Sequence, residues 1–142
     1  MEVIMRRLRI LALLLMILIT VFGIIGCKME DTDIKKLKDL EFTVVEDADL
    51  PGELKEIIDG KKENPFRLTY SNKDYLYIVV GYGQQNSGGY SIAVDELYLT
   101  SNAIYIDTNL VGPLKDDMAV QGVTYPYVVV KTEFMDKKVV FE

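Results

Sequence analysis

The chain has 142 residues, of which 49% are hydrophobic and 27% are charged, with a formal net charge of −6. It contains no tryptophan, no histidine and one cysteine, Cys27. Histidine is the usual general base at neutral pH and the commonest transition-metal ligand, so Ser-His-Asp, Cys-His and histidine-bearing zinc sites are excluded. Nucleic acid repels an acidic surface, so nucleic-acid binding is excluded as well.

The N-terminal segment, residues 1–26, has the layout of an export signal. Three arginines precede residues 10–25, which are almost entirely apolar. A positive flank, an apolar core and a small residue before the cut are typical of secretory signal peptides. The apolar core is shorter than the roughly 20 residues needed to cross about 30 Å of hydrocarbon. Length alone leaves a signal peptide and a short transmembrane anchor both possible. Because of the cysteine that follows, we expect a signal peptide over residues 1–26.

The tetrapeptide Ile24-Ile25-Gly26-Cys27 resembles the lipobox of bacterial lipoproteins. In that pattern the small residue allows cleavage by the signal peptidase, and the cysteine thiol carries diacylglycerol. Two fatty chains hold a protein stably on a bilayer, whereas one chain holds it marginally. We expect lipidation of Cys27 and a position on the outer face of the cytoplasmic membrane or of another envelope membrane. An uncleaved N-terminal anchor with an unmodified cysteine is the alternative.

The part of the chain after the leader is long enough for one domain and too short for two. Without residues 1–26 it has 13 basic and 21 acidic residues, a net charge of −8. Anionic lipid repels such a surface, so membrane affinity is expected from the cysteine alone. Residues 27–40 are dense in charge and predict a solvated tether after the lipidated cysteine. Residues 41–142 are the predicted domain.

A short helix is predicted from Pro51 through about Asp59, with Gly60 ending it. Proline suits the first turn because its missing N–H has no intrahelical partner there, and glycine favours the end of a helix. Leu54, Ile57 and Ile58 recur at i, i+3 and i+4, which predicts one apolar stripe. So short a helix is not stable alone in water, and we expect the stripe to lie on a sheet.

The rest of the domain predicts short strands separated by turns. Residues 75–82 are apolar at both odd-numbered and even-numbered positions, so we expect a central strand covered on both faces. Two hairpins are predicted, one from residues 97–99 and 104–106 and one from residues 131–134 and 138–141. Residues 108–123 show no regular pattern. Six to eight short strands with one helix predict a mainly β fold, either an antiparallel sandwich or a partly open barrel. The remaining expected strands are residues 41–46, 65–70, 90–94 and 128–130.

The polar stretch Gly83 to Gly89 is expected to form a loop. A phosphate-binding loop is excluded, because no lysine follows the glycines and a strand pattern stands where a helix is needed. One interpretation is a long hairpin loop whose glycines take positive φ. The other is a recognition loop with adaptable amide groups beside tyrosine rings. Its candidate residues are Gly83, Gln84, Gln85, Asn86, Ser87, Gly88, Gly89 and Tyr90.

Tyr125, Pro126 and Tyr127 form a second candidate surface. Proline cannot donate to a strand ladder, so Pro126 marks an edge, a bulge or the first residue of a strand. Tyrosines two apart share one face of a strand. They either pack in the core or form an aromatic platform for a peptide or sugar.

No set of residues amounts to an active site. Asp116-Asp117 lacks the spacing of an EF-hand, and Asp95-Glu96 does not suggest the carboxylate pair of a glycosidase. A lipidated cysteine cannot act as a nucleophile. We expect no catalytic residues, no metal and no cofactor; a hydrolase with two converging carboxylates is the enzyme alternative.

Gly88-Gly89-Tyr90-Ser91 and Thr124-Tyr125-Pro126-Tyr127 resemble motifs of the PrcB C-terminal domain family. Members carry the first motif after a strand and a polar loop, and the second before a valine-rich strand. The predicted helix and the strand from Pro65 also sit in similar places, so the likeness extends over residues 41–142. The resemblance implies a non-catalytic accessory protein at the cell surface that associates with and stabilises a secreted protease.

Other binding roles remain open. Over a few residues, the Gly83–Tyr90 loop also resembles the Asn-Pro-Thr-Thr-Gly-Tyr loop of chagasin-type cysteine-protease inhibitors, which implies an inhibitor. The nine tyrosines suggest a lipoprotein that binds cell wall or a small molecule, and this role needs a concave tyrosine-lined pocket. The leading hypothesis is a domain that engages an extracytoplasmic protein through the loop and a nearby sheet edge.

Overall fold

The computed structural model describes residues 1–22, 34–114 and 121–142. The chain divides into two compact units, Met1–Asp33 and Ile34–Glu142. The first unit contains helix α1 (Glu2–Phe22), which includes most of the apolar run of the leader. None of the helices in the described residues is both long enough and apolar enough to cross a membrane. The expected cleavage site and Cys27 lie outside the described residues.

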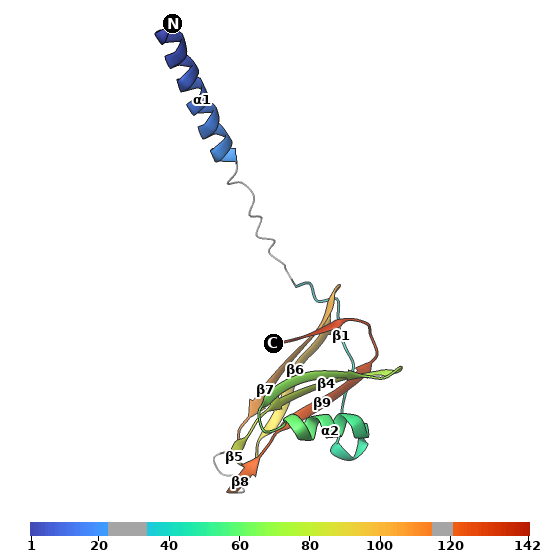
Figure 1. The fold of residues 1–142 in the computed structure, drawn as a ribbon. Coiled ribbons are helices and arrows are strands. Elements are labelled where there is room, and N and C mark those ends of the chain that lie inside the picture. Colours follow the sequence, from blue (N-terminus) through green and yellow to red (C-terminus); the bar gives the residue numbers. More distant parts are fainter. Residues whose placement is uncertain (23–33, 115–120) are drawn as a thin grey trace. The chain divides into compact units, whose positions relative to one another are not determined.

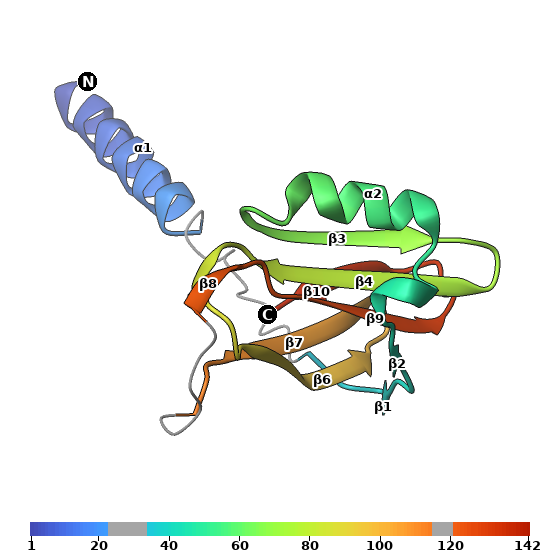
Figure 2. The ribbon, with the colours of Figure 1, turned by 90° about the horizontal axis from the view of Figure 1, so that it is seen from below.

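The second unit is a β sandwich with a helix on one face (Figures 1 and 2). One sheet has the order β1-β6-β7-β10, the other has the order β2-β9-β4-β3, and β5 pairs with β8 in a small third sheet. The mainly β prediction is confirmed, and the fold is a sandwich and not a closed barrel. The elements are β1 (Lys38–Asp39), β2 (Thr43–Val44), the 3-10 turn η1 (Asp47–Asp49), α2 (Gly52–Lys61), β3 (Pro65–Ser71), β4 (Tyr75–Tyr82), β5 (Gln85–Ser87), β6 (Ser91–Leu99), β7 (Ala103–Val111), β8 (Gln121–Thr124), β9 (Tyr127–Glu133) and β10 (Lys138–Phe141).

Strand β4 is covered on both faces, as its composition predicts. Its even-numbered apolar residues face the other sheet, whereas Tyr77 and Val79 face α2, which lies on the outer side of this sheet (Figure 2). The core between the sheets consists of Leu76, Ile78, Val80, Leu97, Ile104, Ile106, Val128 and Val130. The cluster under α2 consists of Leu50, Leu54, Ile58, Tyr77, Val79 and Val129.

Helix α2 begins at Gly52, one residue after the predicted start, with Pro51 as its N-cap, and it continues through Gly60 to Lys61. The predicted end at Gly60 is wrong because the backbone N–H of Lys62 still donates to the carbonyl of Ile58 at 2.9 Å. Leu54 and Ile58 are fully buried, while Ile57 at the edge of the stripe is 36% exposed.

The predicted hairpin between residues 131–134 and 138–141 is wrong. Strand β9 already lies between β4 and β2, so neither of its edges is free for β10. The chain instead crosses to the other sheet, where β10 pairs with β7 in parallel, Lys138 opposite Ala103. This parallel pair also departs from the purely antiparallel arrangement that we expected.

The structure has ten strands in its described residues where six to eight were predicted. The excess consists of short strands, because β1, β2, β5 and β8 have two to four residues each. Only Thr43–Val44 of the strand predicted at residues 41–46 is a strand. Strand β6 is continuous through Asp95–Glu96, where a register shift accommodates the extra residue. The β6–β7 hairpin forms as predicted.

Candidate partner-binding site

The predicted loop begins at Gly83, directly after strand β4. Gly83 has a φ of 73°, and a Cβ at this position would lie 2.7 Å from Cδ of Pro65. Only glycine adopts this conformation without strain and leaves room for the proline ring. The Gln84 N–H then donates to the carbonyl of Glu63 at 3.2 Å, which fixes the direction in which the chain leaves the sheet.

The middle of this segment is a strand, so the interpretation of Gly83 to Gly89 as a loop is wrong in part. Strand β5 pairs antiparallel with β8, with Gln85 opposite Thr124 and Ser87 opposite Gln121. The Thr124 hydroxyl donates to the carbonyl of Ser87 at 2.7 Å. We call these seven residues, 85–87 and 121–124, the ribbon. Its formation also means that residues 108–123 are not wholly irregular, since β7 and β8 occupy both ends of that stretch.

The outer positions of this segment are polar and exposed. Gln84, Asn86 and Gln121 are exposed, whereas Gln85 and Ser87 are half-buried. The side-chain amide of Gln85 donates to the carbonyl of Tyr82 at 3.3 Å, so Gln85 helps to hold the ribbon. Gln84 and Asn86 are therefore the amides of the predicted set that are best placed to meet another molecule.

The segment ends against residues 112–113, which follow β7. Gly89 has a φ of 82°, and a Cβ there would lie 2.9 Å from Cβ of Pro113. The ring of Tyr90 lies beside Gly112, where an added Cβ would meet it at 3.7 Å. Tyr90 is half-buried, so its side chain contributes to packing at the end of the segment more than to the exposed surface.

The second candidate surface follows the ribbon directly, because Thr124 is the last residue of β8. Pro126 lies just before β9, and its carbonyl accepts the N–H of Tyr82 at 3.0 Å. Tyr127 packs against the cluster under α2 and donates its hydroxyl to Asp47. Burial, and then this hydrogen bond, raise the pKa of Tyr127. Tyr127 thus belongs to the scaffold, while half-buried Tyr125 adjoins the ribbon.

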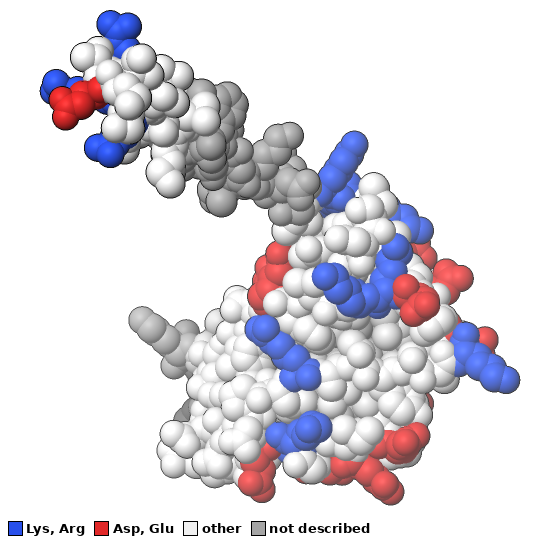
Figure 3. All heavy atoms as spheres, turned by 45° about the horizontal axis from the view of Figure 1, so that its top comes forward, with Lys and Arg blue, Asp and Glu red and all other residues white. Residues whose placement is uncertain are grey.

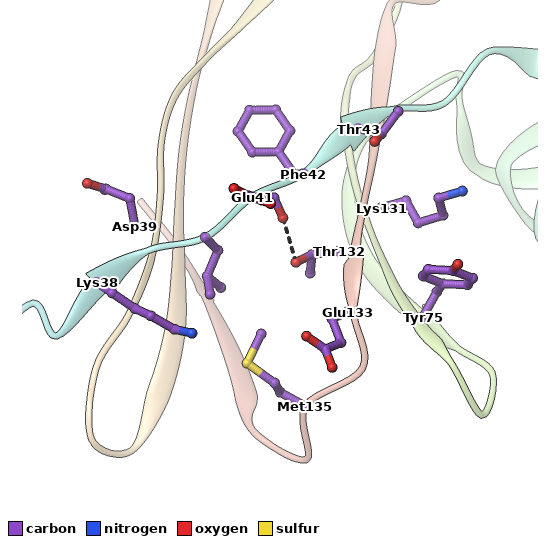
Figure 4. Close-up of a pocket in the computed structure, with 11 residues that line it drawn as sticks. Lys38, Asp39, Glu41, Phe42, Thr43, Tyr75, Lys131, Thr132, Glu133 and Met135 are labelled. Atoms are coloured by element: carbon purple, nitrogen blue, oxygen red, sulfur yellow. Dashed lines mark hydrogen bonds between the residues drawn. The ribbon is translucent and has the colours of Figure 1, made fainter.

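An open groove of about 930 Å³ lies elsewhere on the domain and was not anticipated from the sequence (Figure 4). The chain segment from Lys38 to Thr43 forms one wall and the end of β9 forms the other. The Thr132 hydroxyl donates to the carbonyl of Glu41 at 2.8 Å across its floor, and the Lys131 ammonium lies 4.7 Å from the centre of the Tyr75 ring. No sequence signal marks the groove, because distant segments assemble it: Lys38, Asp39, Leu40, Glu41, Phe42, Thr43, Tyr75, Lys131, Thr132, Glu133 and Met135.

The structure gives little support to the other site chemistries. In the described residues, no three Asp, Glu, Cys or His side chains are grouped so as to hold a metal ion. In the Asp95-Glu96 pair, the Glu96 carboxylate lies 3.7 Å from the Lys36 ammonium. The Asp116-Asp117 pair lies outside the described residues. Three hollows on the described surface are lined by one tyrosine each, so none is the tyrosine-lined pocket that a wall-binding role needs.

The comparison with protein families matches one model, described as PrcB C-terminal, at residues 76–133. This segment belongs to the PrcB C-terminal family. Both motifs that carry the resemblance, Gly88 to Ser91 and Thr124 to Tyr127, lie inside it. No curated protein and no solved structure matches the chain.

The PrcB C-terminal segment runs from β4 to β9 and includes both strands of the ribbon. It also includes the β6–β7 hairpin and two neighbouring strands of the other sheet. Helix α2 and strand β3 precede it, and β10 follows it. The segment therefore contains the candidate binding residues from Gly83 to Tyr90 and from Tyr125 to Tyr127, together with most of the core between the sheets.

Proposed function

We propose that the chain is a lipid-anchored, non-catalytic accessory protein that binds an extracytoplasmic protein, and that this partner is a secreted protease. The observation that carries the proposal is the family match, because the matched segment contains the ribbon and both motifs. The resemblance of these motifs to the PrcB C-terminal family implies a role beside a protease.

The ribbon is the proposed contact with the partner. Among the described residues, each of its strands is paired on one side only, so each leaves a row of backbone groups unpaired. Such an edge can pair with an extended segment of another protein, and neighbouring side chains then supply specificity. The exposed amides of Gln84 and Asn86 and the exposed Val123 side chain offer both hydrogen bonds and apolar contact.

Membrane attachment is proposed to come from a lipid on Cys27 after removal of residues 1–26. The motivation is the lipobox-like tetrapeptide that follows an apolar run with a positive flank. Two acyl chains of a diacylglyceryl group bind a bilayer stably. The non-catalytic part of the proposal is motivated by the absence of histidine from the whole sequence.

The test is affinity purification of the full-length chain from solubilised membranes after crosslinking on intact cells. The chain is expected to recover one defined protein. Replacing both Gln84 and Asn86 with alanine is expected to lower its recovery about tenfold or more, as at interfaces dominated by a few side chains. Asn102→Ala is the control, because Asn102 is an exposed asparagine of the β6–β7 turn, at the other end of β6 from the ribbon. Recovery that the double variant leaves unchanged would exclude the ribbon.

The identity and fate of the recovered protein test the protease part. If the partner is a secreted protease, its half-life in solution is expected to lengthen when the purified chain is added. A recovered protein without protease activity, or a protease whose half-life is unchanged, would contradict this part. Steady turnover of a peptide by the chain alone would contradict the non-catalytic role.

A further inference from the structure

One end of the second unit is built from three segments that are far apart in sequence, residues 34–42, 71–75 and 131–138. The Phe134 N–H donates to the carbonyl of Asp74 at 3.0 Å, and the Thr132 hydroxyl donates to the carbonyl of Glu41. The Lys137 ammonium donates to the carbonyl of Ser101, in the turn between β6 and β7, at 2.8 Å. The chain enters the unit here, at Ile34. We call this region the entry end.

The entry end carries the exposed aromatic side chains of the second unit. Phe42, Tyr75 and Phe134 are 38%, 43% and 41% exposed, and every other aromatic residue described in this unit is half-buried or buried. Ile34 and Leu37, in the first of the three segments, are exposed as well. Two hollows that share Tyr75 and Glu133 open between these side chains. Aromatic and aliphatic side chains grouped in this way are typical of the interface between water and hydrocarbon.

The net charge of the entry end also differs from that of the rest of the second unit. The three segments of the entry end contain seven lysines and five carboxylates, a net of +2. The rest of residues 34–142 has five basic and thirteen acidic residues, a net of −8. In Figure 3 basic side chains and carboxylates are mixed on the upper part of the unit, whereas carboxylates predominate along its lower margin. The overall acidity that predicts repulsion from anionic lipid therefore does not apply to this end.

The length of the chain keeps this end close to the proposed anchor. Seven residue steps separate Cys27 from Ile34, a span of about 25 Å at most when fully extended. A lipid on Cys27 would therefore hold the entry end near the bilayer. The ribbon lies at the other end of strand β6, since β5 precedes Ser91 and the β6–β7 turn follows Leu99.

We propose that the entry end docks on the surface of an anionic phospholipid bilayer. The aromatic side chains enter the headgroup region, the lysines face anionic headgroups, and the ribbon points away from the membrane toward its partner. This inference rests on the proposed membrane anchor and adds an orientation to it.

The chain contains no tryptophan, so a single introduced tryptophan is the only source of tryptophan fluorescence. Its emission therefore tests the environment of one chosen position. Phe134→Trp and, separately, Tyr75→Trp in the full-length chain are reconstituted into vesicles of phosphatidylglycerol and phosphatidylcholine with brominated acyl chains. We expect a blue-shifted emission and roughly twofold quenching for both. Val123→Trp, at an exposed position of the ribbon, is the matched control and is expected to show neither. Equal emission and quenching at the two ends, or no quenching at Phe134 and Tyr75, would overturn the proposal.

Lysine variants test the electrostatic part on the same vesicles. In the Phe134→Trp background, Lys73→Glu with Lys131→Glu is expected to reduce quenching, whereas Lys61→Glu on the exposed side of α2 is expected to leave it unchanged. An equal effect of both changes would contradict docking through the entry end. The mass of the chain in the same sample shows, independently of the quenching, whether Cys27 carries a lipid. A missing lipid would contradict the proposed anchor, while the quenching still decides whether this end touches the bilayer.

Discussion

The hydroxyl of Tyr127 donates a hydrogen bond to Oδ1 of Asp47, which joins strand β9 to the turn before α2. The Tyr127 ring also packs on the cluster under the helix. This bond lowers the pKa of the Asp47 carboxyl, and the Lys55 ammonium, 3.4 Å from that carboxylate, lowers it further. A residue of the second candidate surface thus fastens α2 to the sheet.

Tyr127→Phe is expected to lower the free energy of unfolding by about 1 kcal/mol. This is less than is typical of a hydrogen bond to a charged group, because Asp47 is exposed. The ring would keep its packing, so the fold should persist. Tyr105→Phe is the matched control, since in the described residues the Tyr105 hydroxyl has no hydrogen-bond partner and its ring stacks on Tyr98 at 5.2 Å. Urea unfolding of both variants measures the difference, and equal losses would contradict a role for the bond.

The same bond predicts a dependence on pH. The folded Asp47 carboxyl has a pKa below its ordinary value of 3.8, so its contribution to stability is present above that value. It is lost as pH falls through the lower folded pKa. The stability difference between the native chain and Tyr127→Phe is therefore expected to be constant near neutral pH and to shrink below about pH 4. In an Asp47→Asn background the difference should not change with pH over this range, and a change there would exclude Asp47 as its source.

Helix α2 is held by its buried residues more than by its own propensity. Leu54→Ala is expected to lower the free energy of unfolding by about 2 to 5 kcal/mol, because the side chain is fully buried in the cluster under α2. Ile57→Ala, one turn along the same helix and 36% exposed, is expected to cost less than about 1 kcal/mol. Thermal unfolding of the two variants compares them, and similar losses would show that the helix is not held by this stripe.

Two glycines should respond in opposite directions to alanine. Gly83→Ala is expected to destabilise the domain by about 2 kcal/mol, because its φ is 73° and its Cβ would meet Pro65. Gly60→Ala is expected to stabilise it by about 0.5 kcal/mol, since Gly60 is helical and no atom lies within 4 Å of an added Cβ. Chemical unfolding measures both, and a neutral Gly83→Ala would mean that the chain can leave β4 by another path.

Much of the fold could be predicted because hydrophobic period and turn residues are local signals. Strand β4 has the predicted bounds, since its apolar run ends at turn residues on both sides. The β6–β7 hairpin follows from two apolar segments around Ser101-Asn102. The apolar stripe of α2 is recognisable for the same reason, although its length is not, because Gly60 is tolerated inside the helix.

The rest depends on contacts between distant residues. Gln85–Ser87 has no strand composition and becomes a strand only because Gln121–Thr124 pairs with it. Strand β10 has the composition of a hairpin partner, yet the edges of β9 are occupied, and only the fold as a whole reveals this. The candidate residues of the loop could thus be named from the sequence, but which of them face outward could not.

The most direct test of the central claim, that the ribbon binds a partner protein, is site-specific photocrosslinking in living cells. A photoreactive amino acid replaces Asn86 or, as a control, the exposed Asn102 in the β6–β7 turn, at the other end of β6 from the ribbon, in the full-length chain. We expect an adduct with one defined protein from position 86 and no adduct with that protein from position 102. Identical adducts from both positions, or none from position 86 while the same protein is still recovered with the chain, would contradict it.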